Sequence, residues 1–177
     1  MAHFLSTDFN GIDVLKKDGS VARCRTCEQP IRKYAEQADT GKKANFDFSR
    51  SRDGFVMVSE KFKNLYESCN FQGCDFLLLS SGDYIITPKR CVELEFAPLD
   101  VGKSERCNNC GQFTKFLAAT HKAKINSLEA DIEPNEFVRS SQETPMVVGC
   151  DFHLIVGSAV AEHLRKSRIR TIVLKEI

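Results

Sequence analysis

Residues 54–69 read GFVMVSEKFKNLYESC, and this stretch predicts a short buried strand that leads directly into a capped helix. Residues 55–58 are an apolar run of strand length, and Ser59 is one of the residue types preferred as a helix N-cap. Glu60 falls in the first turn, where the helix dipole favours a negative charge. Apolar side chains then recur at helical spacing on one face: Phe62, Leu65, Tyr66 and Cys69.

A second stretch of the same kind lies near the C-terminus. Residues 153–156 predict a strand, Ser158 predicts a helix N-cap directly after Gly157, and 159–166 carry the helical apolar face. A strand is expected after each helix, so that both stretches become strand–helix–strand units. We expect these closing strands at 74–79 and 171–174.

The shared order of parts favours an internal duplication. A CxxC pair precedes each strand–helix–strand unit, which places the two copies at 20–80 and 105–177 within a single domain over 1–177. The alternative is that strand–helix–strand units are common and that two of them resemble each other by chance. Further strands are predicted at 83–87, 91–96 and 113–118. The sequence therefore predicts an α+β fold with a mainly antiparallel or mixed sheet and a few short helices.

Two cysteine pairs indicate a metal site that joins the two halves. Each CxxC can supply two thiolates to one ion, and two such pairs complete a tetrahedral zinc site. The proposed ligands are Cys24, Cys27, Cys107 and Cys110. Four thiolates leave no open position for water, so the zinc would be structural. The first pair is followed by Glu28, whereas the second pair is followed by Gly111. The alternatives to a zinc site are four reduced thiols without metal, or a redox role for one CxxC pair.

Composition limits the other function classes. The chain has 177 residues, 42% hydrophobic and 28% charged, with a net charge of +1. Its N-terminal segment lacks a basic start and a long apolar stretch, so we expect a cytoplasmic protein. We find no phosphate-binding loop and no metalloprotease or hydrolase motif, which argues against an enzyme. The remaining cysteines are expected in the core as small buried apolar residues: Cys69, Cys74, Cys91 and Cys150.

Charge is distributed unevenly along the chain. Residues 16–52 hold ten Lys and Arg against five Asp and Glu, whereas 129–143 hold five acidic residues against Arg139 alone. Such runs are usually solvated faces. The alternative is that the acidic segment contacts a basic partner, through Glu129, Asp131, Glu133 and Glu136.

The order of parts resembles the bacterial double-CxxCG proteins and related immunity proteins of polymorphic toxin systems. The resemblance rests on the two CxxC pairs and on residues 54–62 followed by 69–76. It implies a protein that binds and neutralises a cognate toxin, with zinc on the four cysteines and no catalytic residues. The departure from the pattern is Glu28, where that family's name implies glycine.

An alternative function is a zinc-ribbon-like nucleic-acid-binding module. Its phosphate contacts would come from basic residues around the first CxxC pair, although the low net charge argues against it. These residues are Lys16, Lys17, Arg23, Arg25, Arg32, Lys33, Lys42 and Lys43.

Overall fold

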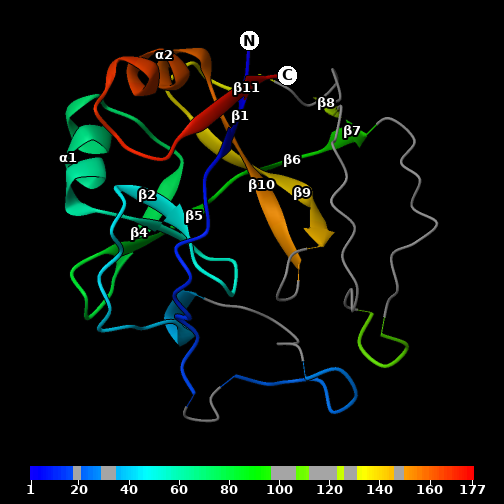
Figure 1. Cartoon of the computed structure of the whole chain (residues 1–177). Helices are drawn as coiled ribbons and strands as arrows, with labels where there is room; N and C mark the ends of the chain where they lie inside the picture. The colour runs from blue at the N-terminus through cyan, green and yellow to red at the C-terminus, as the bar shows by residue number, and fades with distance from the viewer. Residues whose placement is uncertain (18–20, 29–34, 97–106, 112–122, 126–130, 146–149) are drawn as a thin grey trace.

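The computed structural model describes residues 1–17, 21–28, 35–96, 107–111, 123–125, 131–145 and 150–177. They form an α+β fold, as the sequence predicts (Figure 1). The strands are β1 (His3–Ser6), β2 (Phe48–Arg50), β3 (Val56–Val58), β4 (Cys74–Leu78), β5 (Tyr84–Pro88), β6 (Cys91–Val92), β7 (Leu94–Phe96), β8 (Ala123–Ile125), β9 (Phe137–Pro145), β10 (Cys150–Val156) and β11 (Val173–Glu176). The helices are the 3-10 turn η1 (Ala35–Gln37), α1 (Glu60–Ser68) and α2 (Ser158–Lys166).

The strands of the described residues form three sheets. A five-stranded sheet has the order β11-β1-β10-β9-β6, a four-stranded sheet has the order β2-β3-β5-β4, and β7 pairs with β8. Every pairing between these strands is antiparallel except that of β6 with β9. This confirms the prediction of mainly antiparallel or mixed sheets. The strand predicted at 113–118 lies outside the described residues.

Helix α1 begins where its sequence pattern predicts. The Ser59 side chain accepts a hydrogen bond from the backbone N–H of Phe62, which satisfies one of the unpaired donors of the first turn. Phe62 and Tyr66 are buried on the predicted apolar face. The helix ends before Asn70, whose φ of 52° is left-handed and turns the chain toward β4.

Helix α2 begins differently from its prediction. Ser158 is the first helical residue rather than the N-cap, and Gly157 takes the cap position without a side-chain bond. The carbonyl oxygen of Pro134 instead accepts from the N–H of Ala159 at 2.8 Å and of Val160 at 3.1 Å. A distant segment therefore satisfies this helix end, and a serine cap is unnecessary. A Cβ at position 157 would lie 2.1 Å from the Glu133 carbonyl oxygen, so only glycine fits there.

Several predicted strands have different bounds in the structure. The strand predicted at 153–156 begins at Cys150, and two others differ for identifiable reasons. The last strand begins at Val173 rather than at Thr171, because the φ of Thr171 is 71° and this left-handed backbone cannot continue a ladder. The segment 91–96 divides into β6 and β7. These two short strands belong to different sheets, since β6 pairs with β9 and β7 pairs with β8.

The two strand–helix–strand units have the same arrangement of neighbours. In the first unit β5 lies between β3 and β4, and in the second unit β1 lies between β10 and β11. Each middle strand is antiparallel to both neighbours, so the strands on either side of it are parallel and joined by a helix. β2 pairs with β3 as β9 pairs with β10. An internal duplication remains a prediction, and it would account for this shared topology.

One large apolar cluster joins the five-stranded sheet, the four-stranded sheet, α1 and α2. Alternate residues of a strand point to opposite faces, so Val56 and Val58 enter this cluster while Met57 packs on the other face of β3. Phe62 and Phe137 are fully buried within it, and their ring centroids lie 6.2 Å apart. The buried members are Leu5, Phe48, Val56, Val58, Phe62, Tyr66, Phe71, Ile86, Phe137, Leu154, Val156, Val160, Ala161 and Leu164.

Candidate metal centre

The two CxxC loops lie side by side at the lower right of Figure 1, away from both helices. Their backbones fold alike. The N–H of Glu28 donates to the Cys24 carbonyl oxygen at 2.8 Å, and the N–H of Gly111 donates to the Cys107 carbonyl oxygen at the same distance. Glu28 and Gly111 are both left-handed, with φ of 61° and 73°. Glu28 therefore takes the turn that glycine takes in the second loop, and its departure from the family pattern leaves the loop intact.

Left-handed backbone costs a non-glycine residue about 1–2 kcal/mol, whereas glycine adopts it freely. Glu28 is exposed, so its side chain gives up little packing when it is removed. We expect Glu28→Gly to raise the free energy of unfolding by about 0.5–1 kcal/mol, after the entropy that glycine adds to the unfolded chain. Chemical denaturation measures the change.

The reciprocal control is Gly111→Ala, because no atom within 4 Å would meet the added Cβ and only the backbone conformation is tested. This variant should lower stability by about 1 kcal/mol. If Glu28→Gly destabilises as Gly111→Ala does, the two loops do not share the turn that we assign to them.

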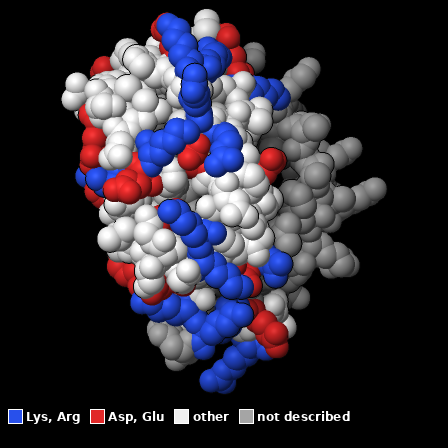
Figure 2. All heavy atoms as spheres, turned by 60° about the vertical axis from the view of Figure 1, so that its left-hand side comes forward, with Lys and Arg blue, Asp and Glu red and all other residues white. Residues whose placement is uncertain are grey.

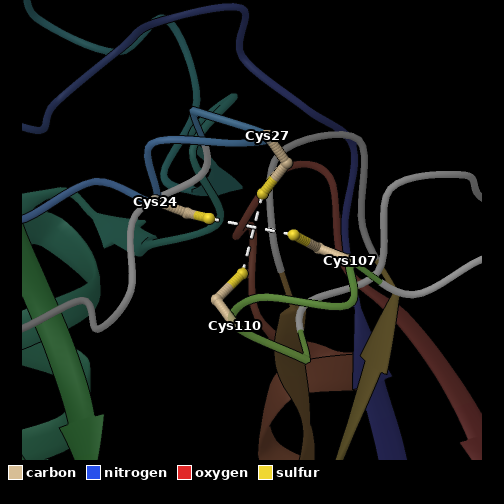
Figure 3. Close-up of side chains that lie close together, drawn as sticks. All are labelled: Cys24, Cys27, Cys107 and Cys110. Carbon is tan, nitrogen blue, oxygen red and sulfur yellow. Dashed lines mark hydrogen bonds between the residues drawn. The ribbon is translucent and has the colours of Figure 1, made fainter.

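The four cysteine side chains point toward one another from the two loops (Figure 3). The Sγ atoms of Cys24 and Cys107 lie 3.8 Å apart, those of Cys27 and Cys110 lie 3.6 Å apart, and all four lie within 4.8 Å of one another. Four sulfurs at about 2.3 Å from a tetrahedral zinc ion are separated by about 3.8 Å from one another. The cluster therefore has the size that a metal ion requires, and the four predicted ligands do come together.

The environment of Cys24 favours a thiolate. Hydrogen bonds from the backbone N–H groups of Cys27 and Thr26 lower the pKa of Cys24 to about 6, against the opposing effect of burial. The Asn109 side chain adds a third donor, with its Nδ2 3.5 Å from the sulfur. Thiolate is the form that binds metal, so these donors prepare a ligand. Asn109 was not singled out from the sequence, and its position between the two cysteines of the second loop is the signal that could have found it.

Burial divides the four ligands into two pairs. Cys24 and Cys107 are buried, while Cys27 and Cys110 are partly exposed. The cluster can therefore hold a metal ion near the surface with one side covered. Four sulfurs would fill a tetrahedral coordination shell, which is typical of a structural site rather than a catalytic one.

The other cysteines divide between core and surface. Cys69 and Cys74 are partly buried against the main apolar cluster, close to the expected position, and burial raises the pKa of the Cys74 thiol. The prediction is wrong for Cys91, which is exposed. It lies in the short strand β6 at the end of the five-stranded sheet, where no strand of the described chain covers its outer side. The side chain of Cys150 lies outside the described residues.

Only part of the predicted acidic surface is exposed and available to contact a partner. Asp131 and Glu133 are exposed, whereas Glu136 forms an ion pair with Arg90 at 3.1 Å and accepts from the N–H of Glu133 at 3.2 Å. An Arg90 nitrogen also donates to the Asp131 carbonyl oxygen at 3.1 Å. Arg90 therefore contacts the acidic segment at both Asp131 and Glu136. Glu129 lies outside the described residues.

The basic residues named for nucleic-acid contact are exposed where the structure describes them. These are Lys16, Lys17, Arg23, Arg25, Lys42 and Lys43, whereas Arg32 and Lys33 lie outside the described residues. The Arg23 guanidinium donates to the Glu28 carbonyl oxygen at 3.0 Å, so this residue supports the first CxxC loop.

Comparisons with family models, curated proteins and solved structures returned no match for this chain. No helix in the described part of the chain is both long and apolar enough to span a membrane.

Proposed function

We propose that this chain is a bacterial immunity protein that binds a cognate protein toxin in the cytoplasm and neutralises it by direct contact. The observation that carries the proposal is the cluster of four cysteines, two from each CxxC loop. It supports the resemblance on which the proposal rests, because it joins the two motifs that define the resemblance. On this proposal the cluster holds one structural zinc ion, and the protein is a binder rather than an enzyme.

The metal would contribute rigidity rather than chemistry. A protein that blocks a partner needs a fixed surface, because each segment that becomes ordered on binding reduces affinity. The two loops come from positions 83 residues apart in the chain. One ion bound to both loops would hold these distant segments in place.

The acidic segment supplies the first proposed contact surface. Complementary charge speeds encounter and fixes the orientation of two proteins. We propose Glu129, Asp131 and Glu133 as contacts for a basic toxin surface. Glu136 is proposed with them, acting through its ion pair with Arg90, which fixes the shape of the segment.

The test is coexpression with the product of the adjacent gene. We expect the two proteins to copurify and the chain to restore growth to cells that produce the toxin. Asp131→Lys with Glu133→Lys should weaken the complex on the order of tenfold, since exposed charges at an interface act on association. The matched control is Glu36→Lys with Glu176→Lys, which makes the same change in net charge at exposed positions elsewhere.

The outcomes separate the function from the surface. If the wild-type chain neither binds nor protects, the immunity function is wrong. If it protects and both charge-reversal variants protect equally well, the function stands and the acidic contact surface is wrong.

A further inference from the structure

A basic surface lies at the end of α2 and the start of its connection to β11. Four exposed cations occur within six residues there, and the exposed Lys61 of α1 joins them. We name Lys61, Arg165, Lys166, Arg168 and Arg170 the basic loop surface. Figure 2 shows Lys and Arg side chains gathered in a column on the side of the molecule that carries the helices. Two carboxylates pair with cations of this surface: Asp47 with Lys61 and Arg170, and Glu162 with Lys166.

Asp47 is largely buried and forms hydrogen bonds that hold the basic loop surface in place. Its carboxylate accepts from Lys61 Nζ at 2.8 Å and from the N–H of Arg170 at 3.3 Å. Lys61 Nζ also donates to the Arg168 carbonyl oxygen at 2.7 Å. Burial raises the pKa of Asp47, but these hydrogen bonds outweigh burial and lower it overall, which keeps the carboxylate ionised. The loop is therefore fixed to the start of α1.

The backbone of the same loop is held in a costly conformation. Thr171 has a φ of 71°, in a region that a β-branched residue rarely adopts. Its hydroxyl donates to the Phe48 carbonyl oxygen, which also accepts from the Thr7 hydroxyl at 2.9 Å. Such conformations cost about 1–3 kcal/mol and persist where surrounding contacts impose them. The chain thus maintains one shape of the loop that carries Arg168 and Arg170, against its own backbone preference.

Two exposed apolar side chains lie two residues along the chain from the threonines that bond to Phe48. Val173 follows Thr171 by two residues and is 60% exposed, and Phe9 follows Thr7 by two residues and is 46% exposed. Thr7 and Thr171 meet at the Phe48 carbonyl oxygen, so the two exposed side chains belong to segments that are joined at this atom. Arginine and aromatic side chains are enriched at protein–protein interfaces.

We propose that the basic loop surface docks an acidic surface of a protein partner. Its arginines can form paired hydrogen bonds with carboxylates. The net charge of only +1 argues against a nucleic acid as the partner. The inference rests on the proposed function for the identity of the partner, which would be the cognate toxin. It adds that this toxin has an acidic surface.

The test uses a defined probe, a fluorescein-labelled acidic peptide in which leucine and serine separate the glutamates. A single-stranded oligonucleotide of equal charge is the comparison, and fluorescence anisotropy measures both. We expect the wild type to bind the peptide more tightly than the oligonucleotide. The variant Arg165→Gln, Lys166→Gln, Arg168→Gln should lose peptide affinity on the order of tenfold. It leaves Lys61 and Arg170 on Asp47, so the loop keeps its support.

The matched control is Lys16→Gln, Lys42→Gln, Lys43→Gln, which removes the same charge from other exposed positions and should change affinity less than about twofold. Thermal melts verify that both variants are folded. Equal losses in the two variants, tighter binding of the oligonucleotide, or no binding of the peptide to the wild type would each overturn the proposal.

The toxin complex separates this inference from the proposed function. If the toxin complex forms equally well with the wild type and with the loop variant, the basic loop surface is not the docking site, and the immunity function still stands. If the wild type forms no complex, the proposed function is wrong, and the peptide measurement still decides whether this surface binds acidic protein.

Discussion

Replacing Cys107 with serine is expected to abolish stoichiometric metal binding and to lower the free energy of unfolding by about 4 kcal/mol. A ligand that binds only the folded state contributes about this much when its free concentration is about a thousandfold above its dissociation constant. Cys107 is buried, and its Sγ lies 3.8 Å from that of Cys24, so a serine there would leave three ligands and a wider gap. For a chain of this length the melting temperature should fall by roughly 8–16 °C.

Elemental analysis and thermal melts with and without a chelator make the measurement. The wild type should bind one zinc ion and lose the same stability to the chelator, whereas the Cys107→Ser variant should no longer respond to it. The control is Cys91→Ser, an exposed cysteine in β6 away from the cluster, which should keep both metal and stability. If wild-type protein contains no metal and melts at the same temperature with and without the chelator, the proposed metal centre is wrong.

Phe137→Ala should lower the free energy of unfolding by about 3–5 kcal/mol, as expected for a large ring removed from a closed core. Phe137 is fully buried at the start of β9, and its ring lies 5.5 Å from that of Tyr66 and 5.8 Å from that of Phe71. Phe62 contacts it edge-on. The substitution removes a large side chain through which the five-stranded sheet packs against α1, so both units should lose stability together.

Urea denaturation measures this loss, and Phe9→Ala is the matched control. Phe9 is 46% exposed, so the same truncation there should change stability by less than about 0.5 kcal/mol. A small effect of Phe137→Ala would mean that the two units are held together by other contacts, with the metal centre as the first candidate.

The parts of the fold that depend on neighbouring residues were predictable. Ser59 caps α1 as predicted, because its partner, the N–H of Phe62, is only three residues away. The end of α2 was not predictable in this way, since its cap is the Pro134 carbonyl oxygen from another part of the chain. The left-handed φ of Thr171 has a similar origin, because contacts with Phe48 impose it on a residue that favours strands.

The sequence predicted the four cysteine ligands better than it predicted the two proposed contact surfaces. Spacing alone identified all four cysteines, because a CxxC pair already places two ligands on one turn. The basic loop surface was missed, because Lys61 lies about a hundred residues before the other four cations and only the fold brings it to Asp47 beside Arg170. The acidic contact surface stays a prediction, and nothing near Glu136 in the sequence indicates its ion pair with Arg90.

The position of β1 makes the two ends of the described chain neighbours. His3 pairs with Glu176 between β1 and β11, and the N–H of Ile177 donates to the Ala2 carbonyl oxygen at 3.1 Å (Figure 1). A short turn could therefore join β11 to β1 as a hairpin. Followed around that closed loop, the order β9-β10-α2-β11-β1 matches β2-β3-α1-β4-β5. The two segments therefore share one connectivity when the β11–β1 pairing is matched with the β4–β5 pairing, as the predicted duplication requires.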